Sequence, residues 1–159
     1  MRIFKDNKGR SWEIVLNVHQ MKRVRAVLGV DLVNVITLER EGEVKVDLID
    51  RIANDPCLLV DILCVLTEKQ AEGYGVTDVE FGESLAGDAI EDATKAFLDE
   101  LVDFFPGAKR LFLKKAVEIA RKFAGEWTGA LEKALNDPQL DARIVQSINS
   151  STSSPESSE

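Results

Sequence analysis

Three helix-start signals between residues 54 and 91 constrain the fold of this chain more than any other feature of its sequence. They are Asn54-Asp55-Pro56, the capping box Thr77-Asp78-Val79-Glu80, and Asp88 followed by Glu91. In each, a polar side chain can accept hydrogen bonds from backbone N–H groups that the first turn of a helix leaves free. Apolar residues recur after each signal at spacings of three and four. We therefore predict a helix from Pro56 to about Gly73, a short one ending at Gly87, and an amphipathic one ending before Pro106.

A further helix is expected over residues 109–124, where the apolar arc is wide. Two neighbouring stripes make up this arc: Phe112, Ala116, Ile119 and Phe123, and beside them Leu113, Val117, Ala120 and Ala124. So wide an arc predicts burial on two sides, in the core or against a partner. Gly125 is expected to interrupt this helix. Asn136-Asp137-Pro138 then indicates a last, weak helix that reaches about Ile148.

The N-terminal segment has the pattern of a β-hairpin. Trp12, Ile14, Leu16 and Val18 alternate with more polar residues, which is the period of a half-buried strand, and Asp6-Asn7-Lys8-Gly9 suits a tight turn. Because a lone hairpin is marginal in water, it must pack on the helices or pair with a strand of another chain. A short helix over 19–28 should follow, with Met21, Val24, Val27 and Leu28 inward.

Residues 30–38 are compatible with either a strand or a helix, and residues 39–43 form a charged turn before a short helix over 46–53. Seven of the last thirteen residues are serine, and such a segment buries too little apolar surface to offset its ordering entropy. The expected fold class is therefore mainly α. A compact helical domain with an N-terminal hairpin spans residues 1–146, and a disordered tail spans 147–159.

Charge is distributed in blocks along the 159 residues, whose net charge is −8. Residues 1–30 carry +5, residues 31–105 carry −14, residues 106–135 carry +4 and the remainder −3. The blocks either neutralise each other within the fold or support head-to-tail self-association. The basic cluster Lys109, Arg110, Lys114 and Lys115 lacks interleaved aromatic residues, so nucleic-acid binding is not expected.

No catalytic or cofactor signature stands out. His19 is the only histidine, without a neighbouring cluster of cysteines and carboxylates, and the chain has no phosphate-binding loop or nucleophile elbow. We expect no enzymatic activity, no cofactor and no metal. Cys57 and Cys64 lie two turns apart in one helix, about 10 Å by rise, so they should not form a disulfide. The sequence shows neither a membrane span nor a secretory signal, which predicts a cytoplasmic protein.

The pair Phe104-Phe105 before Pro106 points to a binding surface. Consecutive residues of a helix point about 100° apart, so the second phenylalanine either fills another packing layer or is exposed. Large exposed apolar groups on a soluble protein mark interaction sites. The candidate protein-binding residues are Phe104, Phe105, Phe112, Ile119 and Phe123.

Over residues 10–125 the chain resembles the tail assembly chaperones of phages and prophages. The similarity rests on the order of Trp12-Glu13-Ile14-Val15-Leu16, Arg23-Val24-Arg25, Gly29-Val30-Asp31-Leu32, Asp55-Pro56, Gln70-Ala71, Gly75-Val76-Thr77 leading into Phe81, Leu85-Ala86-Gly87-Asp88-Ala89-Ile90, Ala96-Phe97-Leu98 and Phe104-Phe105-Pro106. The resemblance implies a small helical protein that binds the long tape measure protein and keeps it soluble during tail assembly. It also implies the cytoplasm of a bacterial host as the place of action, and a frameshift-extended second form exists for some members.

Two other functions are compatible with the sequence. One is a structural head–tail connector or tail component of a phage particle, which the hairpin would join to a ring by strand addition. The other is a small regulator that binds nucleic acid through its basic blocks, for which salt-sensitive DNA binding would be diagnostic.

Overall fold

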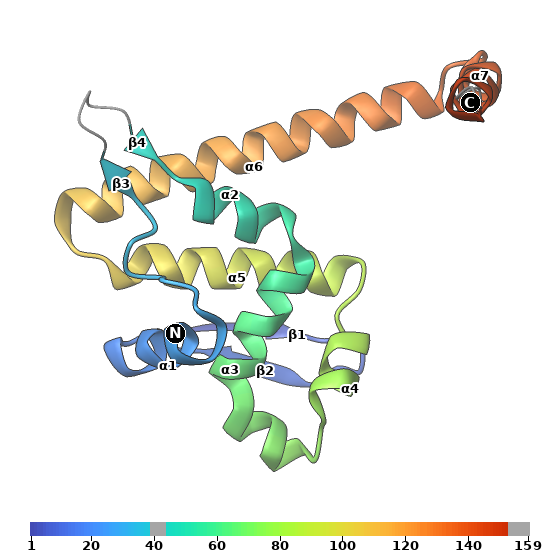
Figure 1. Cartoon of the computed structure of the whole chain (residues 1–159). Coiled ribbons are helices and arrows are strands. Elements are labelled where there is room, and N and C mark those ends of the chain that lie inside the picture. The colour runs from blue at the N-terminus through green and yellow to red at the C-terminus, as the bar shows by residue number, and fades with distance from the viewer. Residues whose placement is uncertain (39–43, 153–159) are drawn as a thin grey trace, which may run out of the picture. The chain divides into compact units, whose positions relative to one another are not determined.

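The computed structural model of the chain describes residues 1–38 and 44–152. These residues form seven helices and two antiparallel two-stranded hairpins, so the mainly α fold with an N-terminal hairpin is confirmed (Figure 1). The chain divides into one unit over Met1–Ala120 and a second from Arg121 onward. This boundary falls earlier than the expected one between residues 146 and 147.

The elements follow one another in a simple order. The strands are β1 (Arg2–Lys5), β2 (Ser11–Ile14), β3 (Thr37–Leu38) and β4 (Val44–Lys45). The helices are α1 (Val18–Leu28), α2 (Asp47–Asn54), α3 (Pro56–Tyr74), α4 (Asp78–Glu83), α5 (Asp88–Phe104), α6 (Gly107–Leu135) and α7 (Leu140–Thr152).

The N-terminal hairpin packs its alternate side chains into the core of the first unit. Strands β1 and β2 pair with Phe4 opposite Trp12, and Phe4, Trp12 and Ile14 are buried. The Trp12 ring stands edge-on to the rings of Phe81 and Tyr74, at centroid distances of 4.7 and 5.1 Å. The hairpin is therefore held by aromatic contacts with α3 and α4 and does not stand alone.

The carboxylate of Asp6, with its side chain fully buried, organises the turn of this hairpin. It accepts four hydrogen bonds, from the backbone N–H groups of Lys8 and Arg10, from Arg10 Nε and from Trp12 Nε1, at 2.6 to 2.9 Å. Burial alone would raise the pKa of Asp6, but these bonds outweigh burial and leave its pKa below the ordinary value. The turn is thus built around an ionised carboxylate.

The outer edge of β2 is closed by side chains of α3. The Gln70 side-chain amide accepts from the N–H of Glu13 and donates to its C=O, both at 2.8 Å, and the Tyr74 hydroxyl donates to the C=O of Ser11 at 2.9 Å. Gln70 therefore occupies the position that the backbone of a third strand would take. Because Glu13 points its backbone groups outward, its partner Ile3 must do the same at the outer edge of β1.

Replacing Gln70 by alanine should reduce stability by about 1–2 kcal/mol, because two backbone groups of Glu13 lose their protein partners. Urea unfolding followed by tryptophan fluorescence would measure the loss. Gln146→Ala, at an exposed position of α7, is the matched control and should change stability by less than about 0.5 kcal/mol. Equal effects of the two substitutions would argue against this pairing.

Two valines near the start of the chain differ from expectation. Val18 was expected inward on the strand but is 61% exposed and begins α1, because the Asn17 side chain accepts the N–H of Gln20 and caps the helix there. Val27 was expected inward but is 65% exposed, since it lies about 120° around the helix from the buried Met21.

The segment that was compatible with either strand or helix is mostly irregular. It buries Leu32 and Val35 and then forms the short strand β3, which pairs with β4. The expected charged turn at 39–43 lies outside the described residues. Helix α2 follows, as expected over residues 46–53, and it buries Ile49 and Ile52.

Two of the three helix-start signals are confirmed as side-chain caps, whereas α5 begins at Asp88 after Gly87 without a side-chain cap. Asp55 caps α3 by accepting from the N–H groups of Cys57 and Leu58, and Thr77 and Glu80 form both bonds of the capping box. Helix α3 runs on through Gly73 and ends at Tyr74, and its C-cap is Gly75, whose φ of 65° favours glycine. The short helix α4 stops at Glu83, earlier than the expected Gly87.

Helix α5 is the centre of the first unit, lying between the β1–β2 hairpin and α2 (Figure 1). Residues on more than one side of it are therefore buried, including Ala93, Phe97 and Leu101. The predicted polar face is confirmed, because Asp92, Lys95 and Asp103 are exposed and Asp99 is half-buried.

Helix α6 continues through Gly125 without the expected interruption, since one glycine costs a helix only about 1 kcal/mol. Helix α7 begins at Leu140, after Asp137 accepts from the N–H of Gln139. It reaches Thr152, so residues 147–152 of the expected tail are helical, and the rest of that tail lies outside the described residues.

Candidate functional site: an apolar face of α6

The turn between α5 and α6 decides where the two consecutive phenylalanines point. Phe105 is only 2% exposed, and its ring meets the half-buried Phe104 ring edge-on, with centroids 5.0 Å apart. The expectation that Phe105 belongs to an accessible surface is therefore wrong. The chain reverses at Pro106 and Gly107, where the φ of Gly107 is 53°, and this reversal turns Phe105 into the core.

The basic residues at the start of α6 hold this turn. Lys109 donates to the C=O of Val33 at 2.7 Å and lies over the Phe105 ring, 4.2 Å from its centroid. Arg110 donates to the C=O groups of Phe105 and Asp103, at 2.7 and 3.0 Å, which places a cation at the carbonyl end of α5. Two of the four residues of the basic cluster thus bind backbone carbonyls.

The two apolar stripes of α6 differ in their exposure to solvent within the first unit. Leu113 and Val117 are fully buried, while Phe112 and Ile119 are 41% and 45% exposed. The exposed pair lies seven residues apart, which is two turns and about 10 Å along one side of the helix. We call Phe112 and Ile119 the α6 face, and the exposed Lys115 lies beside it on the helix.

Phe123, the fifth candidate residue, belongs to the second unit and is 67% exposed. It follows Ile119 by four residues in the sequence. Of the five candidates, two form the α6 face, Phe104 is half-buried, Phe105 is in the core, and Phe123 is exposed on the other unit.

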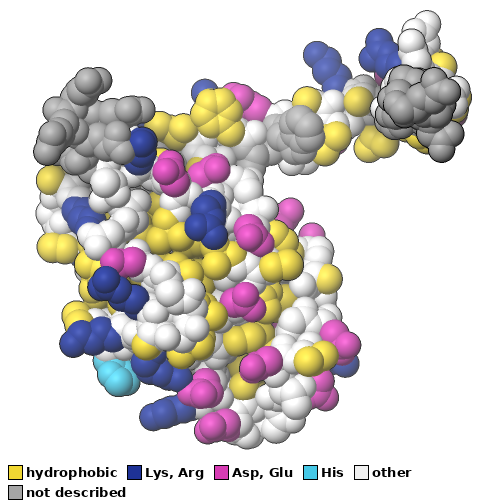
Figure 2. Space-filling model, viewed as in Figure 1, with side chains coloured by type: hydrophobic (Ala, Val, Ile, Leu, Met, Phe, Trp, Pro, Cys, Tyr) yellow, Lys and Arg dark blue, Asp and Glu magenta, His cyan; other side chains and the backbone are white. Residues whose placement is uncertain are grey.

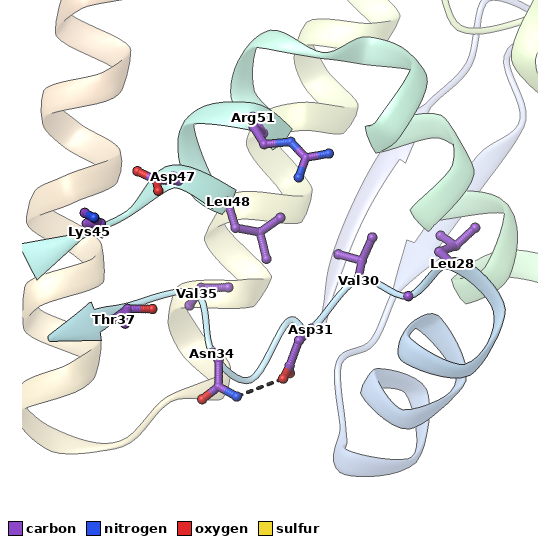
Figure 3. Close-up of a pocket in the computed structure, with 11 residues that line it drawn as sticks. Leu28, Val30, Asp31, Asn34, Val35, Thr37, Lys45, Asp47, Leu48 and Arg51 are labelled. Carbon is purple, nitrogen blue, oxygen red and sulfur yellow. Dashed lines mark hydrogen bonds between the residues drawn. The ribbon is translucent and has the colours of Figure 1, made fainter. Parts of the chain in front are cut away.

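A shallow pocket of about 590 Å³ lies between the end of α1, the segment after it, and α2 (Figure 3). Leu28, Val30 and Leu48 supply apolar surface, and the Arg51 guanidinium turns into the space. Across from it, Asp31 accepts from Asn34 at 2.8 Å, which lowers the pKa of Asp31.

Among the described residues, the cysteines and the one histidine do not lie in a reactive or metal-binding arrangement. Cys57 and Cys64 are both free thiols, and burial, with Asp78 and Asp61 nearby, raises the pKa of Cys64 to about 11. Such a thiol is almost wholly protonated at neutral pH and is a poor nucleophile. His19 is exposed, and among the described residues no three His, Cys, Asp or Glu side chains gather as a metal site would require.

Glu100 is a buried charge that the sequence argument missed. It is 6% exposed, accepts from the N–H of Leu16 at 3.3 Å, and lies 2.5 Å from the amino group of Met1. A signal was present, because Glu100 follows Ala93 by seven residues and Phe97 by three, which places a carboxylate on the apolar stripe. A charge in that position needs a partner, here supplied by the hairpin.

Comparison with models of protein families, with curated proteins and with solved structures gave no match. None of the helices within the described ranges is long and apolar enough to cross a membrane.

Proposed function

We infer that this chain is a non-enzymatic protein-binding module and acts as a tail assembly chaperone that holds a phage tape measure protein soluble in the cytoplasm of a bacterial host. The observation that supports this most is the α6 face, where Phe112 and Ile119 stay about half exposed beside the fully buried Leu113 and Val117. The tail-assembly role itself rests on the resemblance of residues 10–125.

The spacing of the two exposed side chains on the α6 face suits a helical partner. Two large apolar side chains spaced two turns apart on a helix can pack into the grooves of another amphipathic helix. A tape measure protein, as the resemblance implies, is long and helical and offers many such stripes. Lys115 beside the face favours a partner helix with an acidic flanking position, and the net charge of −8 favours the solubility of this chain itself.

Co-expression with a tape measure protein tests the proposal. We expect the long protein to be insoluble alone, to become soluble with this chain, and to co-purify with it in size-exclusion chromatography. Co-expression with Gln70→Ala, which leaves the α6 face intact, should solubilise it equally. If the long protein stays insoluble although this chain is folded and abundant, the chaperone function is refuted.

A structural component of a phage particle is the second candidate, and one observation favours it. Gln70 and Tyr74 close the outer edge of β2, but the backbone N–H and C=O of Ile3 at the outer edge of β1 have no partner among the described residues. An extended segment of a neighbouring subunit could add there as a third strand. This candidate predicts a ring of fixed stoichiometry in the same chromatography. Two features argue against it: the strand has only four residues, and its first and last residues are the charged Arg2 and Lys5, both of which discourage edge pairing.

A further inference from the structure

The outer edge of β1 carries two residues whose backbone groups point away from the hairpin. Asp6 donates its N–H to the C=O of Arg10 across the hairpin at 3.1 Å, so the backbone groups of Asp6 point inward. Because successive residues of a strand point these groups to opposite sides, Lys5 and Ile3 point theirs outward. Neither residue has a hydrogen-bond partner for them in the part of the chain that the structure describes.

A groove of about 430 Å³ lies between this edge and α5. It is lined by Arg2, Ile3, Phe4 and Lys5 of β1 and by Asp92, Lys95, Ala96 and Asp99 of α5. Side chains from both faces of β1 line it, and β2 occupies the other side of the strand, so the groove follows the outer edge. The four helix residues are spaced by three, one and three positions and lie on one side of α5.

The backbone chemistry of the edge indicates what kind of segment fits there. The outward N–H and C=O groups of Ile3 and Lys5 can form four hydrogen bonds with an extended chain, whereas the backbone groups of a helix are already paired with each other. Ile3 is 57% exposed, so an apolar side chain directly opposite it would cover apolar surface. The groove therefore suits an extended segment.

The local charges of the groove decide between a second copy and another protein. Side chains of both signs lie on the face of the first unit that Figure 2 shows, so overall charge does not select the partner. At the edge itself, Arg2 is held by Asp103 at 2.5 Å, while the exposed Lys5 has no partner within the described ranges. A second copy would bring another Lys5 to the same short ladder, and like charges on paired strands are unfavourable.

An acidic side chain directly opposite Lys5 would instead form a favourable cross-strand pair. Asp92 and Asp99 on the helix wall disfavour additional acidic residues in the segment. The fitting occupant therefore carries one acidic residue among neutral ones.

We propose that the groove between β1 and α5 binds a short extended segment of another protein, which pairs with β1 as a third strand and places one acidic side chain opposite Lys5. This site is separate from the α6 face and does not depend on the tail-assembly role. Because β1 has only four residues, the segment is short and its affinity moderate.

A synthetic peptide added to the full chain tests the proposal. The probe has about eight residues, blocked at both ends, with valine and threonine in alternation and one central glutamate. Its dissociation constant should be about 10–500 μM. At about 1 mM peptide, amide hydrogen exchange followed by NMR should slow at least about fivefold at Ile3 and Lys5, whose N–H groups gain acceptors. Exchange at Phe4, whose N–H already lies inside the ladder, should change little.

Two controls separate backbone pairing from charge. The same peptide with its central residues N-methylated keeps its side chains but loses its N–H donors, and it should not slow exchange. Lysine in place of the glutamate, or Lys5→Glu in the chain, should weaken binding about fivefold. Lys22→Glu makes the same charge change at an exposed position of α1 and should leave binding unchanged.

Unchanged exchange at Ile3 and Lys5 overturns the proposal, and so does equal binding of the N-methylated peptide. Exchange that slows as the concentration of the chain alone rises would assign the edge to a second copy and also overturn it. Equal binding of the glutamate and lysine peptides would overturn the acidic partner. Because no tape measure protein is present, none of these results depends on the proposed chaperone function.

Discussion

Replacing Asp6 by alanine should destabilise the first unit by about 3–5 kcal/mol, the usual cost of removing one partner of a buried charged network. The substitution leaves Trp12 Nε1, Arg10 Nε and two backbone N–H groups in the hairpin turn without the acceptor they share. Because the Trp12 ring also contacts Phe81 and Tyr74, the loss should spread to α3 and α4. Denaturant unfolding followed by circular dichroism would measure it.

The pH dependence separates the charge from the shape of this side chain. The pKa of Asp6 is lowered in the folded state, so its contribution is complete above the unfolded pKa of about 3.9 and is lost as the pH falls through the folded value. The stability difference between wild type and Asp6→Asn should therefore be constant near neutrality and shrink below about pH 4. Asp92→Ala, an exposed control, should change stability by less than about 0.5 kcal/mol at all pH values. A difference between wild type and Asp6→Asn that grows on acidification would contradict the account.

Phe105→Ala should cost about 3–5 kcal/mol, as removal of a fully buried aromatic ring does. The ring fills the space under the α5–α6 turn and carries the contacts with Phe104 and Lys109, so its loss leaves a cavity where the chain reverses. Thermal unfolding would show the effect as a large drop in Tm.

The matched control is Phe112→Ala, which removes the same side chain from a 41% exposed position of α6. Its cost should be about 1 kcal/mol, because part of that ring is already in water. If the two substitutions cost the same, the assignment of Phe105 to the core is incorrect. The comparison also shows why Phe105 is a poor probe of binding. A Phe105 variant that fails to bind a partner would do so because it unfolds.

Local signals in the sequence were sufficient to predict the elements that depend on near neighbours. The capping box at Thr77, the Asp55-Pro56 helix start and the alternation of Trp12 and Ile14 each involve residues within four positions, and all are confirmed. Val18 shows the limit of such patterns, because the strand alternation continues through it in the sequence, whereas β2 ends at Ile14 and the cap formed by Asn17 starts α1 at Val18.

The features that the sequence could not predict depend on contacts between residues far apart in the chain. The sequence places Phe104 and Phe105 about 100° apart, but only the reversal at Gly107 and the bonds of Arg110 decide which ring is buried. Likewise, both stripes of α6 are equally apolar, and only packing in the first unit distinguishes the buried Leu113 and Val117 from the α6 face. The pairing of Gln70 with Glu13 joins residues 57 positions apart and leaves no local signal.

The most direct test of the protein-binding role is the affinity for a tape measure protein of a chain altered only on the α6 face. Phe112→Asp with Ile119→Asp places two carboxylates on that face, and Val27→Asp with Val79→Asp makes the same change at positions 65% and 70% exposed on α1 and α4. Each double variant is first shown to unfold at nearly the wild-type denaturant concentration, and binding is then measured by calorimetry. The account predicts at least a tenfold loss of affinity, about 1.4 kcal/mol, for the first variant and wild-type binding for the second. Wild-type affinity in both, or an equal loss in both, would contradict the assignment of binding to the α6 face.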